Sequence, residues 1–140
     1  MIFCTAVNCI DGRVQLPVIN YLKVRFSANH VDMITETGPS RILSELTACM
    51  IVGSIITRID LSIQKHSSRG IALVGHHDCA GNPFRKEEQI SHIQESIKFL
   101  KNRFPNVEII SLWVDQNCRV FEIDNTNRRK SKNWKNTIPN

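Results

Sequence analysis

Short apolar runs alternate along the chain with longer segments in which apolar residues recur every three or four positions. The apolar runs have the length and residue types of buried strands, and they cover residues 2–8, 31–35, 71–75 and 107–114. The segments with helical spacing cover residues 15–26, 42–65 and 87–104. The second of these segments is either one long helix or two helices joined near Gly53. A turn at residues 115–117 predicts a short antiparallel strand over residues 119–123.

Strands that alternate with helices predict βαβ units, in which parallel strands are connected by helices that cover both faces of the sheet. We therefore expect a three-layer α/β fold with a central, mostly parallel sheet of about four strands and a short antiparallel edge strand. In open sheets of this kind, functional sites lie beyond the carboxyl ends of the strands. The loops that follow the first and third apolar runs are therefore the first places to search for chemistry.

The charge of the chain is concentrated in its last residues. The formal net charge is +5, but residues 124–140 hold five basic residues against Asp124 alone, which leaves +1 for residues 1–123. We therefore predict one domain over residues 1–123 and a polar, basic, disordered tail over residues 124–140. Such a tail can attract phosphate groups, but the domain itself does not have the basic surface of a nucleic-acid-binding protein.

The apolar runs and the cysteines bear on where the protein works. No run approaches the ~20 residues needed to cross a bilayer, and no charged leader precedes the first strand. We therefore expect a cytoplasmic protein that does not bind membranes. An odd number of cysteines, five, argues against a disulfide framework in that compartment. Free cysteines are usually small buried apolar residues, so any further role needs a specific reason.

Two loops supply that reason. The first apolar run leads into Cys9-Ile10-Asp11-Gly12-Arg13, and the third leads into Gly75-His76-His77-Asp78-Cys79. If the two runs form neighbouring parallel strands, Cys9, His76 and Cys79 converge. Thiolate and imidazole groups suit zinc. Each motif alone is weak, because His-x-x-Cys and Asp-Gly-Arg are common by chance, but their position after two apolar runs favours a shared site.

Three protein ligands would leave the fourth tetrahedral position of a zinc ion open to water or an anion, which is typical of catalytic zinc. Water bound there becomes acidic enough to supply hydroxide near neutral pH, a nucleophile for a small electrophile. Asp11 can accept a hydrogen bond from that water, and Arg13 can hold the carboxylate ionised. If Arg13 released it, Asp11 could become a fourth zinc ligand, which would give a closed, inactive state.

The two loops, Cys-x-Asp-x-Arg and Gly-His-x-x-Cys, resemble the zinc signature of the β-class carbonic anhydrases. The resemblance implies Zn²⁺ held by Cys9, His76 and Cys79, with Asp11 and Arg13 as a catalytic dyad that orients zinc-bound hydroxide toward carbon dioxide. It also implies a homodimer or higher homo-oligomer whose small-molecule substrate is carbon dioxide or bicarbonate. The chain resembles a compact, divergent member, without the N-terminal helical arm that is usual in the family.

Other functions stay open at this point. Ala80 stands where the family usually has glycine, and Asn82-Pro83-Phe84 replaces a run of small residues. Related enzymes hydrolyse carbonyl sulfide or carbon disulfide with the same ligands. A zinc-binding protein without carbonic anhydrase activity and a metal-free α/β binding domain are further alternatives. His77 is either a proton shuttle or a loop residue that faces solvent.

Overall fold

The computed structural model describes residues 1–124. The predicted basic tail, apart from Asp124, lies outside the described residues. The strands are β1 (Phe3–Cys9), β2 (His30–Glu36), β3 (Gly70–His76), β4 (Glu108–Val114) and β5 (Val120–Ile123). The helices are the short 3₁₀ helix η1 (Gly12–Val14) and α1 (Gln15–Arg25), α2 (Pro39–Glu45), α3 (Cys49–His66) and α4 (Lys86–Arg103).

The five strands form one sheet in the order β2-β1-β3-β4-β5. The first four are parallel, and β5 pairs antiparallel with β4 at the edge. The predicted α/β fold with a short antiparallel edge strand is therefore confirmed. The pairing that matters most for the site is that of β1 with β3, in which Val7 lies opposite Leu73. This pairing brings the carboxyl ends of the two strands side by side.

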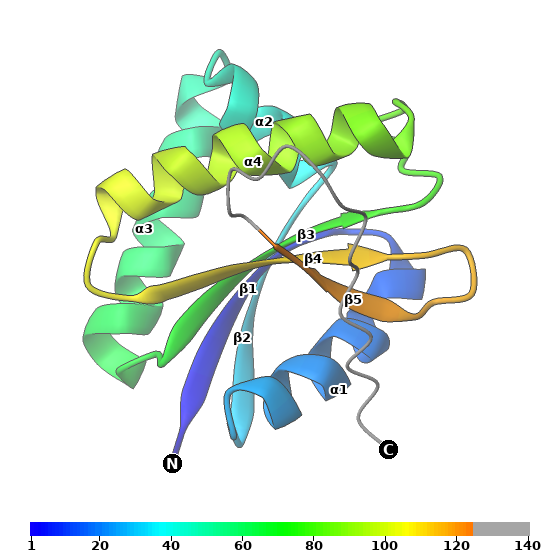
Figure 1. The fold of residues 1–140 in the computed structure, drawn as a ribbon. Coiled ribbons are helices and arrows are strands. Elements are labelled where there is room, and N and C mark those ends of the chain that lie inside the picture. Colours follow the sequence, from blue (N-terminus) through cyan, green and yellow to red (C-terminus); the bar gives the residue numbers. More distant parts are fainter. Residues whose placement is uncertain (125–140) are drawn as a thin grey trace.

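Helices cover both faces of the sheet, as Figure 1 shows. Helix α1 packs on one face, where its Leu22 joins Leu112 of β4 in a fully buried cluster. Helices α2, α3 and α4 pack on the other face, where Ile59 and Leu100 contact a second cluster around Leu73. Each fully buried aliphatic side chain stabilises the fold by roughly 1.5–3 kcal/mol. The two clusters pack the strands between the helices, and so set the positions of the loops at their ends.

The predicted division of the segment 42–65 near Gly53 is wrong. Helix α2 ends before Leu46, whose backbone is left-handed with φ 57°, and α3 begins at Cys49. Gly53 lies inside α3, where a Cβ atom would meet nothing within 4 Å. The chain turns earlier because α2 packs against α4, whereas α3 packs against β1 and β2.

Within residues 1–124, no single helix is long and apolar enough to cross a membrane. Helices α2 and α3 reach that length and composition only when they are taken together across a bend of 113°.

Candidate metal centre

Two residues of the site that are far apart in the sequence lie at the ends of neighbouring strands. Cys9 is the last residue of β1, and His76 is the last residue of the adjacent parallel strand β3. Cys79 follows in the next loop, where Asp78 takes a left-handed conformation, with φ 55°, that turns the chain. One potential ligand atom from each of Cys9, His76 and Cys79 lies within 4.8 Å of the other two, and all three residues are buried.

The geometry of this Cys9–His76–Cys79 cluster fits a zinc ion. The Cys9 and Cys79 Sγ atoms lie 3.9 Å apart. Two thiolates on tetrahedral zinc, with Zn–S bonds of about 2.3 Å, would lie roughly 3.8 Å apart. His76 Nδ1 donates a hydrogen bond to the His77 carbonyl at 2.8 Å, which leaves the lone pair on Nε2. Nε2 is buried without a hydrogen-bond partner in the described chain, as an imidazole prepared for a metal would be.

The cluster also favours thiolate formation. A hydrogen bond donated by the Cys79 thiol lowers the pKa of Cys9 and raises that of Cys79, and the backbone N–H groups of Asp11 and Gly38 lower the pKa of Cys9 further. Burial alone would lower the pKa of the His76 imidazole, but its interaction with the Cys9 sulfur raises that pKa. A divalent metal that bound both sulfurs would displace the remaining thiol proton.

Asp11 and Arg13 form a two-pronged ion pair beside the cluster. Arg13 Nε donates to Asp11 Oδ1 at 3.0 Å and Arg13 Nη2 donates to Oδ2 at 2.7 Å. These bonds lower the pKa of the Asp11 carboxyl to about 2. Arg13 also donates to the Asp78 carbonyl at 3.2 Å, so one guanidinium connects both ligand loops. The carboxylate of Asp11 is held by Arg13 and is not one of the atoms of the Cys9–His76–Cys79 cluster.

Two glycines let a third loop approach the site. A Cβ atom on Gly81 would lie 2.5 Å from the backbone carbon of Thr37, and one on Gly38 would lie 2.6 Å from that of Gly81. The backbone after β2 therefore passes directly against the backbone after Cys79. This contact places the Gly38 N–H near the Cys9 sulfur and the Gly81 N–H near the Cys79 sulfur.

Sequence reasoning missed two glutamines that hold the ligand loops. Gln15 Nε2 donates to the carbonyls of Cys9 at 2.6 Å and Asp11 at 2.9 Å. Gln89 Nε2 donates to the carbonyls of His76 at 3.1 Å and Phe84 at 3.2 Å. Each glutamine lies in the first turns of the helix that follows its loop. That position is the only signal the sequence carries, and it does not reveal the carbonyl partners.

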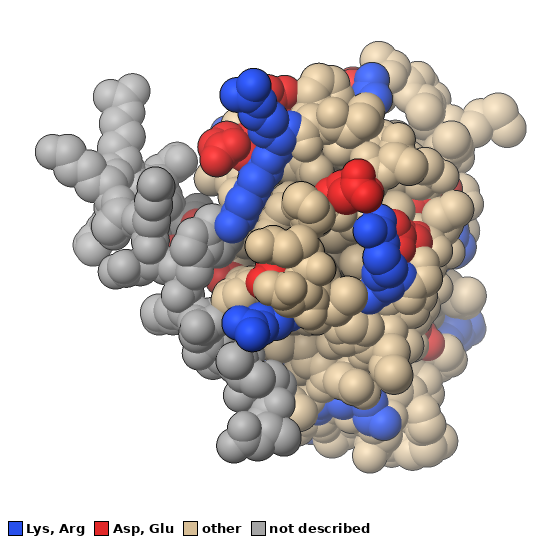
Figure 2. All heavy atoms as spheres, turned by 90° about the vertical axis from the view of Figure 1, so that its right-hand side faces the viewer, with Lys and Arg blue, Asp and Glu red and all other residues tan. Residues whose placement is uncertain are grey.

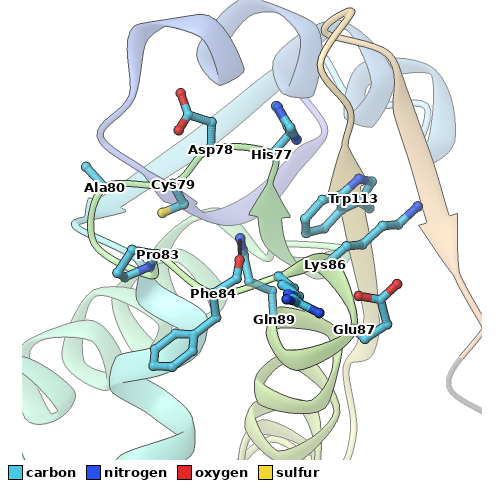
Figure 3. Close-up of a pocket in the computed structure, with 11 residues that line it drawn as sticks. His77, Asp78, Cys79, Ala80, Pro83, Phe84, Lys86, Glu87, Gln89 and Trp113 are labelled. Atoms are coloured by element: carbon cyan, nitrogen blue, oxygen red, sulfur yellow. Dashed lines mark hydrogen bonds between the residues drawn. The ribbon is translucent and has the colours of Figure 1, made fainter.

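A pocket of about 580 Å³ adjoins the cluster (Figure 3). Its lining comes from the ligand loop, the start of α4 and β4, and comprises His77, Asp78, Cys79, Ala80, Pro83, Phe84, Arg85, Lys86, Glu87, Gln89 and Trp113. His77 is exposed and lines this pocket. On the side of the molecule toward which β3 and β4 run, basic and acidic side chains are interspersed (Figure 2).

The fold and the cluster define an α/β protein with a candidate metal centre at the carboxyl ends of two parallel strands. Residues 1–124 match the family model described as "Putative carbonic anhydrase". The chain therefore belongs to this carbonic anhydrase family. No curated protein matches the chain significantly.

Two solved structures have a similar fold. One comes from a study of two tetrameric β-carbonic anhydrases of the filamentous ascomycete Sordaria macrospora. The two chains are 14% identical, the match covers 86% of this chain and 79% of the Sordaria chain, and the TM-score is 0.52. The other is the β-carbonic anhydrase CafA of the fungal pathogen Aspergillus fumigatus. The two chains are 11% identical, the match covers 89% of this chain and 76% of the CafA chain, and the TM-score is 0.57. At these identities the likeness concerns the fold alone.

Proposed function

We propose that the protein catalyses the zinc-dependent hydration of carbon dioxide to bicarbonate. The observation that carries this proposal is the buried Cys9–His76–Cys79 cluster, whose Nε2 has no hydrogen-bond partner in the described residues and whose sulfurs lie at a zinc-compatible distance. Membership of the carbonic anhydrase family supports the same reaction.

In this proposal Cys9 and Cys79 bind the metal as thiolates and His76 binds it through Nε2. Zinc, when bound, acts as a Lewis acid that makes water acidic near neutral pH. The hydrogen bond from His76 Nδ1 to the His77 carbonyl fixes the imidazole ring in the tautomer that binding requires. The backbone N–H groups of Gly38 and Gly81 stabilise the negative charge of the two sulfurs.

Asp11 orients the attacking water by accepting a hydrogen bond from it, and Arg13 keeps the carboxylate ionised and in place. The two-pronged pair between them is consistent with an open site, in which Asp11 does not bind the metal. Movement of Arg13 away from Asp11 would free the carboxylate to become a fourth ligand, and would close the site.

The experiment that tests this function measures zinc content and carbon dioxide hydration on the same purified sample, at pH 7 and pH 9. We expect about one zinc per chain, because the structure offers one such cluster in residues 1–124. We expect faster hydration at pH 9. Because the pKa of Asp11 is lowered to about 2, this carboxyl is ionised at both pH values, and the rise reports deprotonation of the attacking water instead.

The same sample separates the alternatives. Zinc without hydration at either pH would contradict the proposed reaction while retaining the metal site. Protein that contains no zinc, purified without chelator, would contradict the metal site itself.

We also propose that the chain assembles into a homodimer or a larger homo-oligomer. Two apolar side chains beside the site, Ile10 and Leu16, are 60% and 64% exposed, and burial in an interface would remove them from water. The study of the Sordaria enzymes describes tetramers. Sedimentation velocity at micromolar concentration should give at least twice the mass of the chain, 16.0 kDa. A species of monomer mass across the concentration range would contradict this assembly.

A further inference from the structure

Asn82 lies in the loop between Cys79 and α4, and none of its surface is exposed to solvent. A buried amide costs free energy unless its polar ends are hydrogen-bonded, and both ends of this one are. Asn82 Nδ2 donates to Ser40 Oγ of α2 at 3.2 Å, and Asn82 Oδ1 accepts from His92 Nδ1 of α4 at 3.1 Å. One amide therefore connects the loop after Cys79 to two helices.

The groups that hold Asn82 are themselves held. Ser40 is 1% exposed, and its carbonyl accepts a hydrogen bond from Ser96 Oγ of α4 at 2.7 Å. Helices α2 and α4 pack against each other on the same face of the sheet (Figure 1). The Phe84 N–H donates to the Asn82 carbonyl at 2.8 Å, and the Phe84 ring meets the His92 ring edge-on. A buried network whose members are satisfied in this way specifies one arrangement of the segments that it joins.

The main chain that this network holds is also the main chain that contacts the Cys79 sulfur. The Cys9 sulfur and burial raise the pKa of the Cys79 thiol, and hydrogen bonds from the backbone N–H groups of Asn82 and Gly81 act in the opposite direction. These N–H groups favour the thiolate, which is the form that binds a metal. Groups that hydrogen-bond a metal ligand also set its direction and its electron donation.

The packing of α2 against α4 does not by itself require polar groups at this place. Hydrogen-bonded partners that are replaced together by apolar groups of the same shape leave stability nearly unchanged. We propose that Asn82 is a positioning residue of the metal centre, whose bonds to Ser40 and His92 hold its backbone N–H against the Cys79 sulfur. This inference rests on the metal site of the proposed function, but not on the hydration reaction.

The Asn82→Leu variant tests the proposal, because leucine has a similar size and makes neither side-chain hydrogen bond. Zinc affinity, measured by competition with a chromophoric chelator, should fall about 10–100-fold. Cobalt bound in place of zinc provides a second readout, the thiolate-to-metal charge-transfer absorption. Loss of an N–H···S bond raises the energy of the sulfur lone pairs, so this band should move to longer wavelength. A role limited to the stability of the fold would not move the band.

Ser62→Ala is the matched control. Ser62 is a buried polar residue of α3, and its hydroxyl lies 2.7 Å from Thr5 Oγ1 and donates to Asp32 Oδ2 at 2.6 Å. The variant removes buried hydrogen bonds that do not involve a ligand loop, so zinc affinity and the cobalt band should stay unchanged. If Asn82→Leu and Ser62→Ala behave alike, Asn82 only supports the fold and the proposal is overturned.

Ser40→Ala repeats the test with Asn82 in place, and so covers the case in which Asn82→Leu does not fold. It should weaken zinc binding and shift the cobalt band in the same direction, by less than Asn82→Leu does. Added to Asn82→Leu, it should weaken zinc binding no further, because the bond between the two side chains is already absent. A Ser40→Ala protein with unchanged zinc affinity and an unchanged band contradicts the proposal.

Metal binding and turnover distinguish this inference from the proposed function. Unmodified protein that binds zinc without hydrating carbon dioxide, together with the expected effects of Asn82→Leu, would contradict the function alone. Hydration by the unmodified protein, with zinc affinity and cobalt band unchanged in Asn82→Leu, would contradict the role of Asn82 alone. Unmodified protein that binds neither zinc nor cobalt would overturn both.

Discussion

The Cys79→Ser variant should lose nearly all of its bound zinc and, with it, the hydration of carbon dioxide. A serine hydroxyl keeps its proton at neutral pH, so the cluster would retain one thiolate and one imidazole, too few ligands for a catalytic zinc. Outer-shell changes already lower metal affinity by about 10–100-fold, so loss of a direct ligand should lower it at least about a hundredfold. Atomic absorption after dialysis and stopped-flow hydration measure the two losses on one sample.

Cys49→Ser is the matched control, because Cys49 is exposed and far along the chain from both ligand loops. It should retain zinc and activity, which would show that the effect of Cys79→Ser does not come from loss of a cysteine as such. Thermal unfolding of both variants checks that the chain still folds. A Cys79→Ser protein that keeps stoichiometric zinc would remove Cys79 from the proposed ligand set.

The convergence of Cys9, His76 and Cys79 could be predicted from the sequence because its determinants are mostly local. An apolar run predicts a buried strand, and the residues immediately after it must lie at the end of that strand. Cys9 and His76 therefore had to lie at strand ends, and Cys79 within one loop of His76. The pairing of Asp11 with Arg13 is equally local, since only one residue separates them and a 3₁₀ turn brings them together. The pattern does not determine the order of the strands in the sheet. That β1 and β3 are neighbours was therefore an assumption, which the strand order confirms.

The features that were mispredicted or missed depend on contacts between distant segments. The chain bends at Leu46 rather than Gly53 because α2 and α3 pack against different partners, which no helical period encodes. A glycine inside a helical pattern is an unreliable sign of a break for the same reason. The two carbonyls bound by Gln89 lie 13 and 5 positions before it, so its role emerges only from the folded loop.

The close approach of the backbone at Gly81 to the backbone at Thr37 also cannot be predicted from the sequence pattern. We expect Gly81→Ala to lower the free energy of unfolding by about 1–3 kcal/mol, because its Cβ would lie 2.5 Å from the Thr37 carbon and the backbone would have to move. The movement would withdraw the Gly81 N–H from the Cys79 sulfur. Zinc affinity should therefore fall together with stability. Urea unfolding and a competitive zinc titration measure the two quantities.

Gly53→Ala provides the control for this substitution, because a Cβ atom there meets nothing within 4 Å and the residue lies inside α3. Alanine favours a helix interior over glycine by up to about 1 kcal/mol, so this variant should gain stability and leave zinc affinity unchanged. Opposite signs for the same chemical change would show that the loss at Gly81 comes from the approach of the β2 loop. If Gly81→Ala instead kept full stability and zinc affinity, the close passage of the two loops would not be needed to hold Cys79 in place.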